Sequence, residues 1–148
     1  MISTPPDNIV KFHYVSGPFA FVKRNQVKAS LVLLFKNEHR SFHTLDYIFC
    51  NDKYLLKINK KFLGHDTLTD IITFDLSDAE SVITGEIYIS IERVKDNARL
   101  FKKTFQQELL RVIFHGALHL CGYRDKSEKE KSSFRTKENE YIQLYLGS

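Results

Sequence analysis

The chain is organised around the stretch Phe114-His115-Gly116-Ala117-Leu118-His119-Leu120-Cys121-Gly122-Tyr123-Arg124-Asp125. His115 and His119 are four residues apart, so both imidazoles project from one face of a helix at neighbouring heights. Residues 104–121 are otherwise mostly apolar, which predicts a buried helix with one polar stripe facing a cleft. That stripe contains Glu108, Arg111, His115 and His119.

A glycine and a carboxylate follow this helix and suggest a metal site. Gly122 tolerates a left-handed backbone, so we expect the helix to end there and the chain to turn back. The reversal can bring Asp125 to the side of the two histidines. Three protein ligands with one position left to water are typical of catalytic zinc sites. Two histidines at this spacing are also common as ordinary polar residues or as a partner contact, but the apolar helix, the glycine and the carboxylate favour the metal. Gly116 replaces the glutamate of HExxH, which argues against a zinc protease.

The same residues carry a family resemblance. His115-Gly116-x-Leu118-His119-Leu120-x-Gly122-Tyr123 resembles the signature of the YbeY family, bacterial metal-dependent endoribonucleases of ribosomal RNA maturation. Upstream, Ile58-Asn59, Thr69-Asp70-Ile71-Ile72-Thr73-Phe74 and Gly85-Glu86-Ile87-Tyr88-Ile89-Ser90 resemble further family segments in the same order. The resemblance implies a zinc-type ion, cleavage of single-stranded RNA in 16S rRNA maturation and ribosome quality control, and ribosome or small-subunit assembly components as partners.

The chain departs from the family pattern at three positions. Asp125 stands where the resemblance places the third metal histidine; a carboxylate can bind zinc but adds negative charge to the ligand set. Leu63 occupies the position of a basic residue thought to face the RNA. Arg124 stands where the family usually has an aspartate, and we hypothesise that it partly replaces the missing positive charge.

Length and composition predict one domain spanning residues 1–148. The chain has 43% apolar residues, a net charge of +4 and a pI near 9.0, which fits a polyanionic partner without requiring one. We expect a cytoplasmic protein with two reduced cysteines, because the sequence shows no signal peptide and no membrane-length apolar run.

Periodicity and turn residues predict an α+β fold with a small mixed four-stranded sheet and about five helices. The expected strands are 9–14, 42–50, 70–76 and 83–90. The expected helices are 19–37, 52–62, 91 to about 102, 104–121 and 127 to about 145. Asn51, Ser90, Thr104 with Gln107, and Ser127 with Glu130 are the predicted helix caps. Residues 63–68 form a loop by composition.

The leading hypothesis is a zinc-dependent endoribonuclease in which His115, His119 and Asp125 hold the ion and a metal-bound water attacks a phosphodiester. His65 is a secondary ligand or acid/base candidate, and Glu108 a candidate for orienting an imidazole. Two alternatives stay open: a non-catalytic ribosome-associated RNA-binding or assembly factor with a structural metal, and a metal hydrolase of another substrate.

Overall fold

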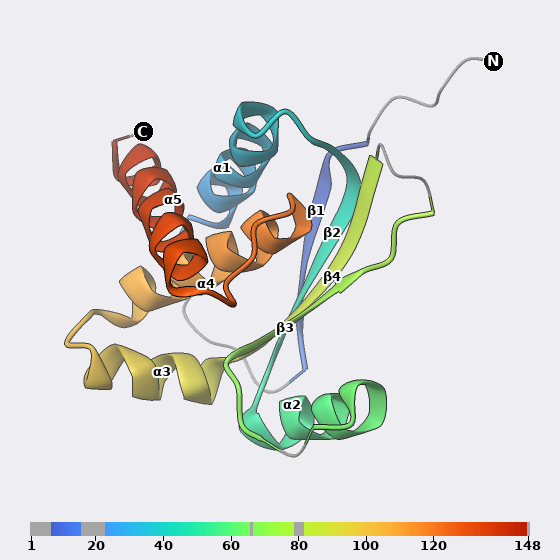
Figure 1. Cartoon of the computed structure of the whole chain (residues 1–148), viewed down its shortest axis with the longest axis vertical. Helices are drawn as coiled ribbons and strands as arrows, with labels where there is room; N and C mark the ends of the chain where they lie inside the picture. Colours follow the sequence, from blue (N-terminus) through green and yellow to red (C-terminus); the bar gives the residue numbers. More distant parts are fainter. Residues whose placement is uncertain (1–6, 16–22, 66, 79–81, 148) are drawn as a thin grey trace.

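The computed structural model describes residues 7–15, 23–65, 67–78 and 82–147 of the chain. These residues form a four-stranded sheet with α1, α4 and α5 on one side and α2 at one end (Figure 1). The predicted α+β class, with its small mixed sheet and five α-helices in the described residues, is confirmed. No helix in this described part combines the length and the apolar character that a membrane crossing requires.

Apart from the start of the first helix, the ends of the elements lie within two residues of the predicted ones, and the predicted helix 52–62 is divided into two elements. In chain order they are β1 (Ile9–Tyr14), α1 (Arg24–Asn37), β2 (Ser41–Cys50), α2 (Asp52–Ile58), the π-helical segment η1 (Asn59–Leu63), β3 (Ile71–Asp75), β4 (Val82–Ser90), α3 (Ile91–Leu100), α4 (Phe105–Leu120) and α5 (Glu128–Leu146). Residues 19–22 of the predicted first helix lie outside the described residues. Leu63, predicted to open a loop, instead ends η1.

The strand order is β1-β2-β4-β3. β1 pairs with β2 and β2 with β4 in parallel, whereas β3 pairs with β4 in antiparallel. The buried side chains of the two central strands join the main core under the helices: Phe42, Leu45, Tyr47 and Phe49 from β2, and Ile83, Ile87 and Ile89 from β4. β3 is therefore an edge strand, and α4 packs beside it.

All four predicted helix caps are present. Asn51 accepts from the Tyr54 amide at 2.8 Å, and Ser90 accepts from the Arg93 amide at 3.2 Å. Thr104 and Ser127 each form a complete capping box with the side chain three residues later, which fixes where α4 and α5 begin.

α4 ends as the sequence predicts. Gly122 has φ +107°, its amide donates to the His119 carbonyl at 3.0 Å, and the Tyr123 amide donates to the Leu118 carbonyl at 3.1 Å. This is the Schellman pattern, in which a left-handed residue closes the last helical turn. The Arg40 guanidinium also donates to the Cys121 carbonyl at 2.9 Å. The direction in which the chain leaves α4 is therefore fixed.

α4 lies close to the sheet because of a glycine. An ideal Cβ on Gly116 would be 3.0 Å from both Ile71 Cδ1 and Ile87 Cγ2, closer than ordinary van der Waals contact. On β2, the buried Tyr47 hydroxyl donates to the Ile113 carbonyl of α4 at 2.8 Å. These contacts hold the helix that carries both histidines against the sheet.

Candidate functional site

His115 and His119 lie side by side on α4, as their spacing predicts. Their ring centroids are 4.9 Å apart and the rings are nearly perpendicular. The side chain of His115 is 18% exposed and that of His119 33% exposed, so both reach the surface from a helix that is otherwise largely buried. The polar stripe therefore does open to solvent at this end.

The turn after Gly122 brings Asp125 to the two imidazoles. Asp125 Oδ2 lies 3.6 Å from His115 Nε2 and 3.5 Å from His119 Nε2. One ligand atom from each of the three residues lies within 4.8 Å of the other two. Tetrahedral zinc with bonds of about 2.0–2.1 Å separates its ligand atoms by roughly 3.4 Å. The two Asp125 distances are close to that separation, so the three residues fit a small divalent ion.

These residues form one end of an open cleft of about 640 Å³ between α4, β3 and the segment that follows α2. The described lining residues are Asn59, Leu63, His65, Thr67, Thr69, Asp70, Ile71, Ile72, Thr73, Asp75, His115, His119, Leu120 and Asp125. None of them is lysine or arginine. A cation bound at the histidines would therefore add a positive charge to a cleft whose described lining has no lysine or arginine.

His65 and Arg124 lie differently with respect to the cleft. The exposed side chain of His65 lines it, so the loop that precedes β3 does face the histidines. Arg124 is not among the described lining residues; its Nε lies 3.8 Å from Glu130 Oε2. This position of Arg124 does not support the hypothesis that its positive charge replaces the missing basic residue beside the metal site.

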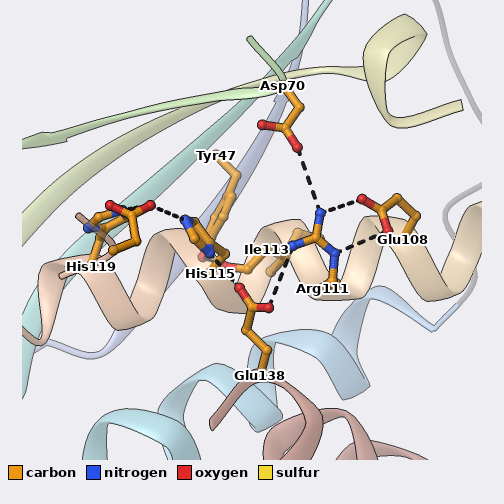
Figure 2. Close-up of polar contacts among 9 residues, drawn as sticks. Tyr47, Asp70, Glu108, Arg111, Ile113, His115, His119 and Glu138 are labelled. Carbon is orange, nitrogen blue, oxygen red and sulfur yellow. Dashed lines mark hydrogen bonds and ion pairs between the residues drawn. The ribbon is translucent and has the colours of Figure 1, made fainter. Parts of the chain in front are cut away.

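Glu108 does not have the role proposed from the sequence. It is buried and forms two contacts with Arg111, one of them 3.1 Å from Arg111 Nε to Glu108 Oε1. The carboxylate that contacts His115 Nδ1 is Glu138, from α5 (Figure 2). Glu108 is two helical turns away from His115 on the same helix, whereas Glu138 of α5 packs against the His115 ring. The carboxylate partner of His115 is therefore set by the packing of α5 on α4 and not by the polar stripe of α4.

The sequence analysis did not place Glu138 or Phe134 at the site, although both are buried on α5 beside His115. Glu138 is only 3% exposed and Phe134 2% exposed. The Phe134 ring stacks on the His115 imidazole, with centroids 4.1 Å apart and an angle of 19°. The two residues are four positions apart, so their side chains lie on one face of α5. This spacing is the sequence signal that could have marked the face as buried.

The surroundings of the site shift the pKa values of three titratable groups. Burial, reinforced by the neighbouring His115, lowers the pKa of His119, which favours the neutral imidazole that a metal requires. Burial raises the pKa of Asp70, although Arg111 opposes the rise. Burial also disfavours the charged form of Arg111, yet its contacts with Glu108 and Glu138 raise its pKa above the ordinary value. Arg111 therefore stays cationic among carboxylates.

Comparison with known proteins identifies close relatives. The family described as Endoribonuclease YbeY matches residues 21–145. A protein of that name from Cytophaga hutchinsonii is 50% identical over 122 residues, covering 82% of this chain and 85% of the relative. Another from Flavobacterium psychrophilum is 52% identical over 109 residues, covering 74% and 77%. A solution structure of a Thermotoga maritima protein aligns with a TM-score of 0.64 and 29% identity, covering 94% of this chain and 89% of that one.

Proposed function

Because this chain belongs to the Endoribonuclease YbeY family, we propose that residues 1–148 act as one metal-dependent endoribonuclease domain, with a zinc-type ion held by His115, His119 and Asp125. The observation that carries the proposal is the convergence of these three side chains at the end of the cleft. The proposed substrate is single-stranded ribosomal RNA in the cytoplasm, with ribosomal assembly components as partners; the relatives' name supports only the cleavage of RNA.

The charges around the site favour a bound cation. Three carboxylates, those of Asp70, Glu108 and Glu138, lie around the single guanidinium of Arg111. A fourth carboxylate, that of Asp125, lies against the imidazoles of His115 and His119. A buried or half-buried excess of negative charge is costly unless a positive partner is present. A divalent ion at the histidines would offset this excess, and imidazole with carboxylate is a donor set that zinc accepts.

When bound, the ion would supply Lewis-acid chemistry, acidifying water and offsetting negative charge on the phosphoryl oxygens. The protein residues then hold and align the substrate. The cleft between α4 and β3 is open to solvent, and we propose that the hydroxyls of Thr67, Thr69 and Thr73, which line it, contact the RNA backbone. His65, Asp70 and Asp75 are the titratable residues of the described lining outside the ligand set, and we propose His65 and Asp70 as candidates for moving a proton to the leaving oxygen.

The test compares metal content and RNA cleavage in the same preparations. Elemental mass spectrometry of the untagged protein, purified without chelator, should give about one zinc-type ion per chain. His119→Ala and Asp125→Ala should lose the ion and the cleavage of single-stranded RNA together. His13→Ala is a matched control, because His13 of β1 also pairs with an aspartate, Asp46 of β2, at 2.7 Å. A wild-type protein that takes up no metal but cleaves RNA would refute the proposed mechanism.

Leu63 favours a second candidate function. It lines the cleft, is 45% exposed and provides no charge for a phosphate. A non-catalytic RNA-binding or assembly factor with a structural metal would tolerate that residue. Gel shifts with single-stranded RNA, together with metal binding but no cleavage, would support this candidate over the first.

A further inference from the structure

His115 is held from two directions by residues of α5. Its Nδ1 contacts Glu138 Oε2, and the Phe134 ring stacks on its plane at 4.1 Å. Its Nε2 lies on the opposite edge of the ring, 3.6 Å from Asp125 Oδ2 at the cleft. The imidazole therefore has one nitrogen facing the buried carboxylate and the other facing the candidate ligand set (Figure 2).

Glu138 is itself held in place. Its second oxygen, Oε1, lies 3.5 Å from Arg111 Nη1. Arg111 in turn donates from Nε to Glu108 Oε1 at 3.1 Å and contacts Glu108 Oε2 with Nη2, while Asp70 lies 3.9 Å away. Because a guanidinium presents its donors in a rigid fork, Arg111 fixes the orientation of the Glu138 carboxylate.

This arrangement selects one form of the His115 ring. An ionised carboxylate can only accept hydrogen bonds, so Nδ1 must carry the proton that it donates to Glu138. In the neutral ring the lone pair then belongs to Nε2, which faces the cleft. A histidine that binds a metal through one nitrogen commonly donates from the other to a carboxylate, which fixes its tautomer and orientation.

We propose that Glu138 is a positioning residue: it holds His115 with the Nε2 lone pair directed to the cleft, and Arg111 and Glu108 keep Glu138 in that position. α5 thereby becomes part of the site, although none of its described residues lines the cleft. This inference rests on the proposed function only for the identity of the bound ion. The orientation and tautomer of the His115 imidazole depend on the residues of the chain itself.

The first test needs no metal. In wild-type protein stripped with chelator and held at alkaline pH, ¹⁵N NMR of the histidine side chains distinguishes the two tautomers of a neutral imidazole. We expect His115 to carry its proton on Nδ1, with that proton shifted far downfield by the bond to Glu138. A ring protonated on Nε2 would overturn the proposal, whatever the metal or RNA assays show.

The second test removes the charge but keeps the shape. The glutamine amide of Glu138→Gln can take two orientations. With its oxygen toward His115, its NH₂ group points to the Arg111 donors, which cannot accept a hydrogen bond. With its NH₂ group toward His115, it donates to Nδ1 and favours the tautomer protonated on Nε2. We expect zinc affinity, measured by calorimetry, to fall about 10- to 100-fold. The NMR signature of the Nδ1 proton should be lost in the same variant.

Glu140→Gln is the matched control. It removes the same charge from the same helix, but the Glu140 side chain is 54% exposed and pairs only with Lys137 among the described residues. Its zinc affinity should equal that of wild type. A folded Glu138→Gln variant with wild-type zinc affinity would overturn the positioning role. If wild type binds no zinc while its His115 shows the expected tautomer, the proposed function fails and the positioning role survives.

Discussion

At the scale of single residues, Leu63 is the cleft side chain that fits RNA binding least well. It ends η1, lines the cleft and is 45% exposed, while no described lining residue is a lysine or arginine. A longer cationic side chain at this position would remain in water and would therefore not incur a burial cost.

Leu63→Arg should consequently strengthen RNA binding through one additional phosphate contact. We expect tighter binding at low salt and a steeper salt dependence, with the slope of log K against log salt more negative by about 0.7 for single-stranded RNA. Fluorescence anisotropy across a salt series measures both quantities. Leu68→Arg adds the same charge at a side chain that is 56% exposed but does not line the cleft. An equal change in slope for both variants would show that the effect is general charge rather than a cleft contact.

The residues of the candidate site differ in how far the sequence could predict them. His115, His119 and Asp125 are close in the chain, so the helical period and the stop at Gly122 suffice to bring them together. Glu138 is on another helix, and its contact with His115 depends on how α5 packs against α4, which no local pattern specifies. Glu108 was assigned its role from the stripe alone, and the structure gives that role to Glu138.

At the scale of elements, the packing of α4 on the sheet depends on Gly116. In the sequence analysis this glycine argued against the HExxH motif and formed part of the family signature. Its packing role could not be predicted, because the strands that face it are far away in the chain. In the structure a Cβ here would approach Ile71 Cδ1 and Ile87 Cγ2 at 3.0 Å. Helix boundaries were predicted well because caps are local, whereas this close approach joins segments far apart in the chain.

Two substitutions at Gly116 should therefore have different effects on the free energy of unfolding. In Gly116→Ala the two methyl contacts must yield slightly, and the higher helix propensity of alanine, about 1 kcal/mol, offsets that strain. Gly116→Val adds branched bulk that the side-chain ends cannot avoid, and we expect a loss of about 2–3 kcal/mol. Urea unfolding followed by circular dichroism measures both values. Equal stability of the valine variant and wild type would mean that α4 does not need this close approach.

At the scale of the whole molecule, the fold brings negative charge together from separate segments. Asp70 immediately precedes β3, Glu108 is on α4 and Glu138 on α5, and all three lie around Arg111. Asp125 comes from the segment between α4 and α5 and lies against the two imidazoles. Folding therefore concentrates carboxylates that would lie apart in an unfolded chain. A cation bound at the proposed metal site would offset this concentration of negative charge, so the proposal links metal binding to the stability of the entire fold.

Zinc should accordingly raise the melting temperature of the protein. A ligand that binds only the native state at about 100 times its Kd adds about 2.7 kcal/mol, which corresponds to roughly 5–10 °C for a chain of this size. Thermal unfolding of chelator-treated protein with and without added zinc measures the shift. Asp125→Ala should show almost no shift, yet its apo form should be no less stable than apo wild type, because the substitution removes one of the clustered charges. Two outcomes would contradict this prediction: a wild-type melting temperature that does not change in saturating zinc, and a shift in Asp125→Ala equal to that of wild type. Either would mean that His115, His119 and Asp125 do not bind the ion and that the negative charge of these carboxylates is offset without it.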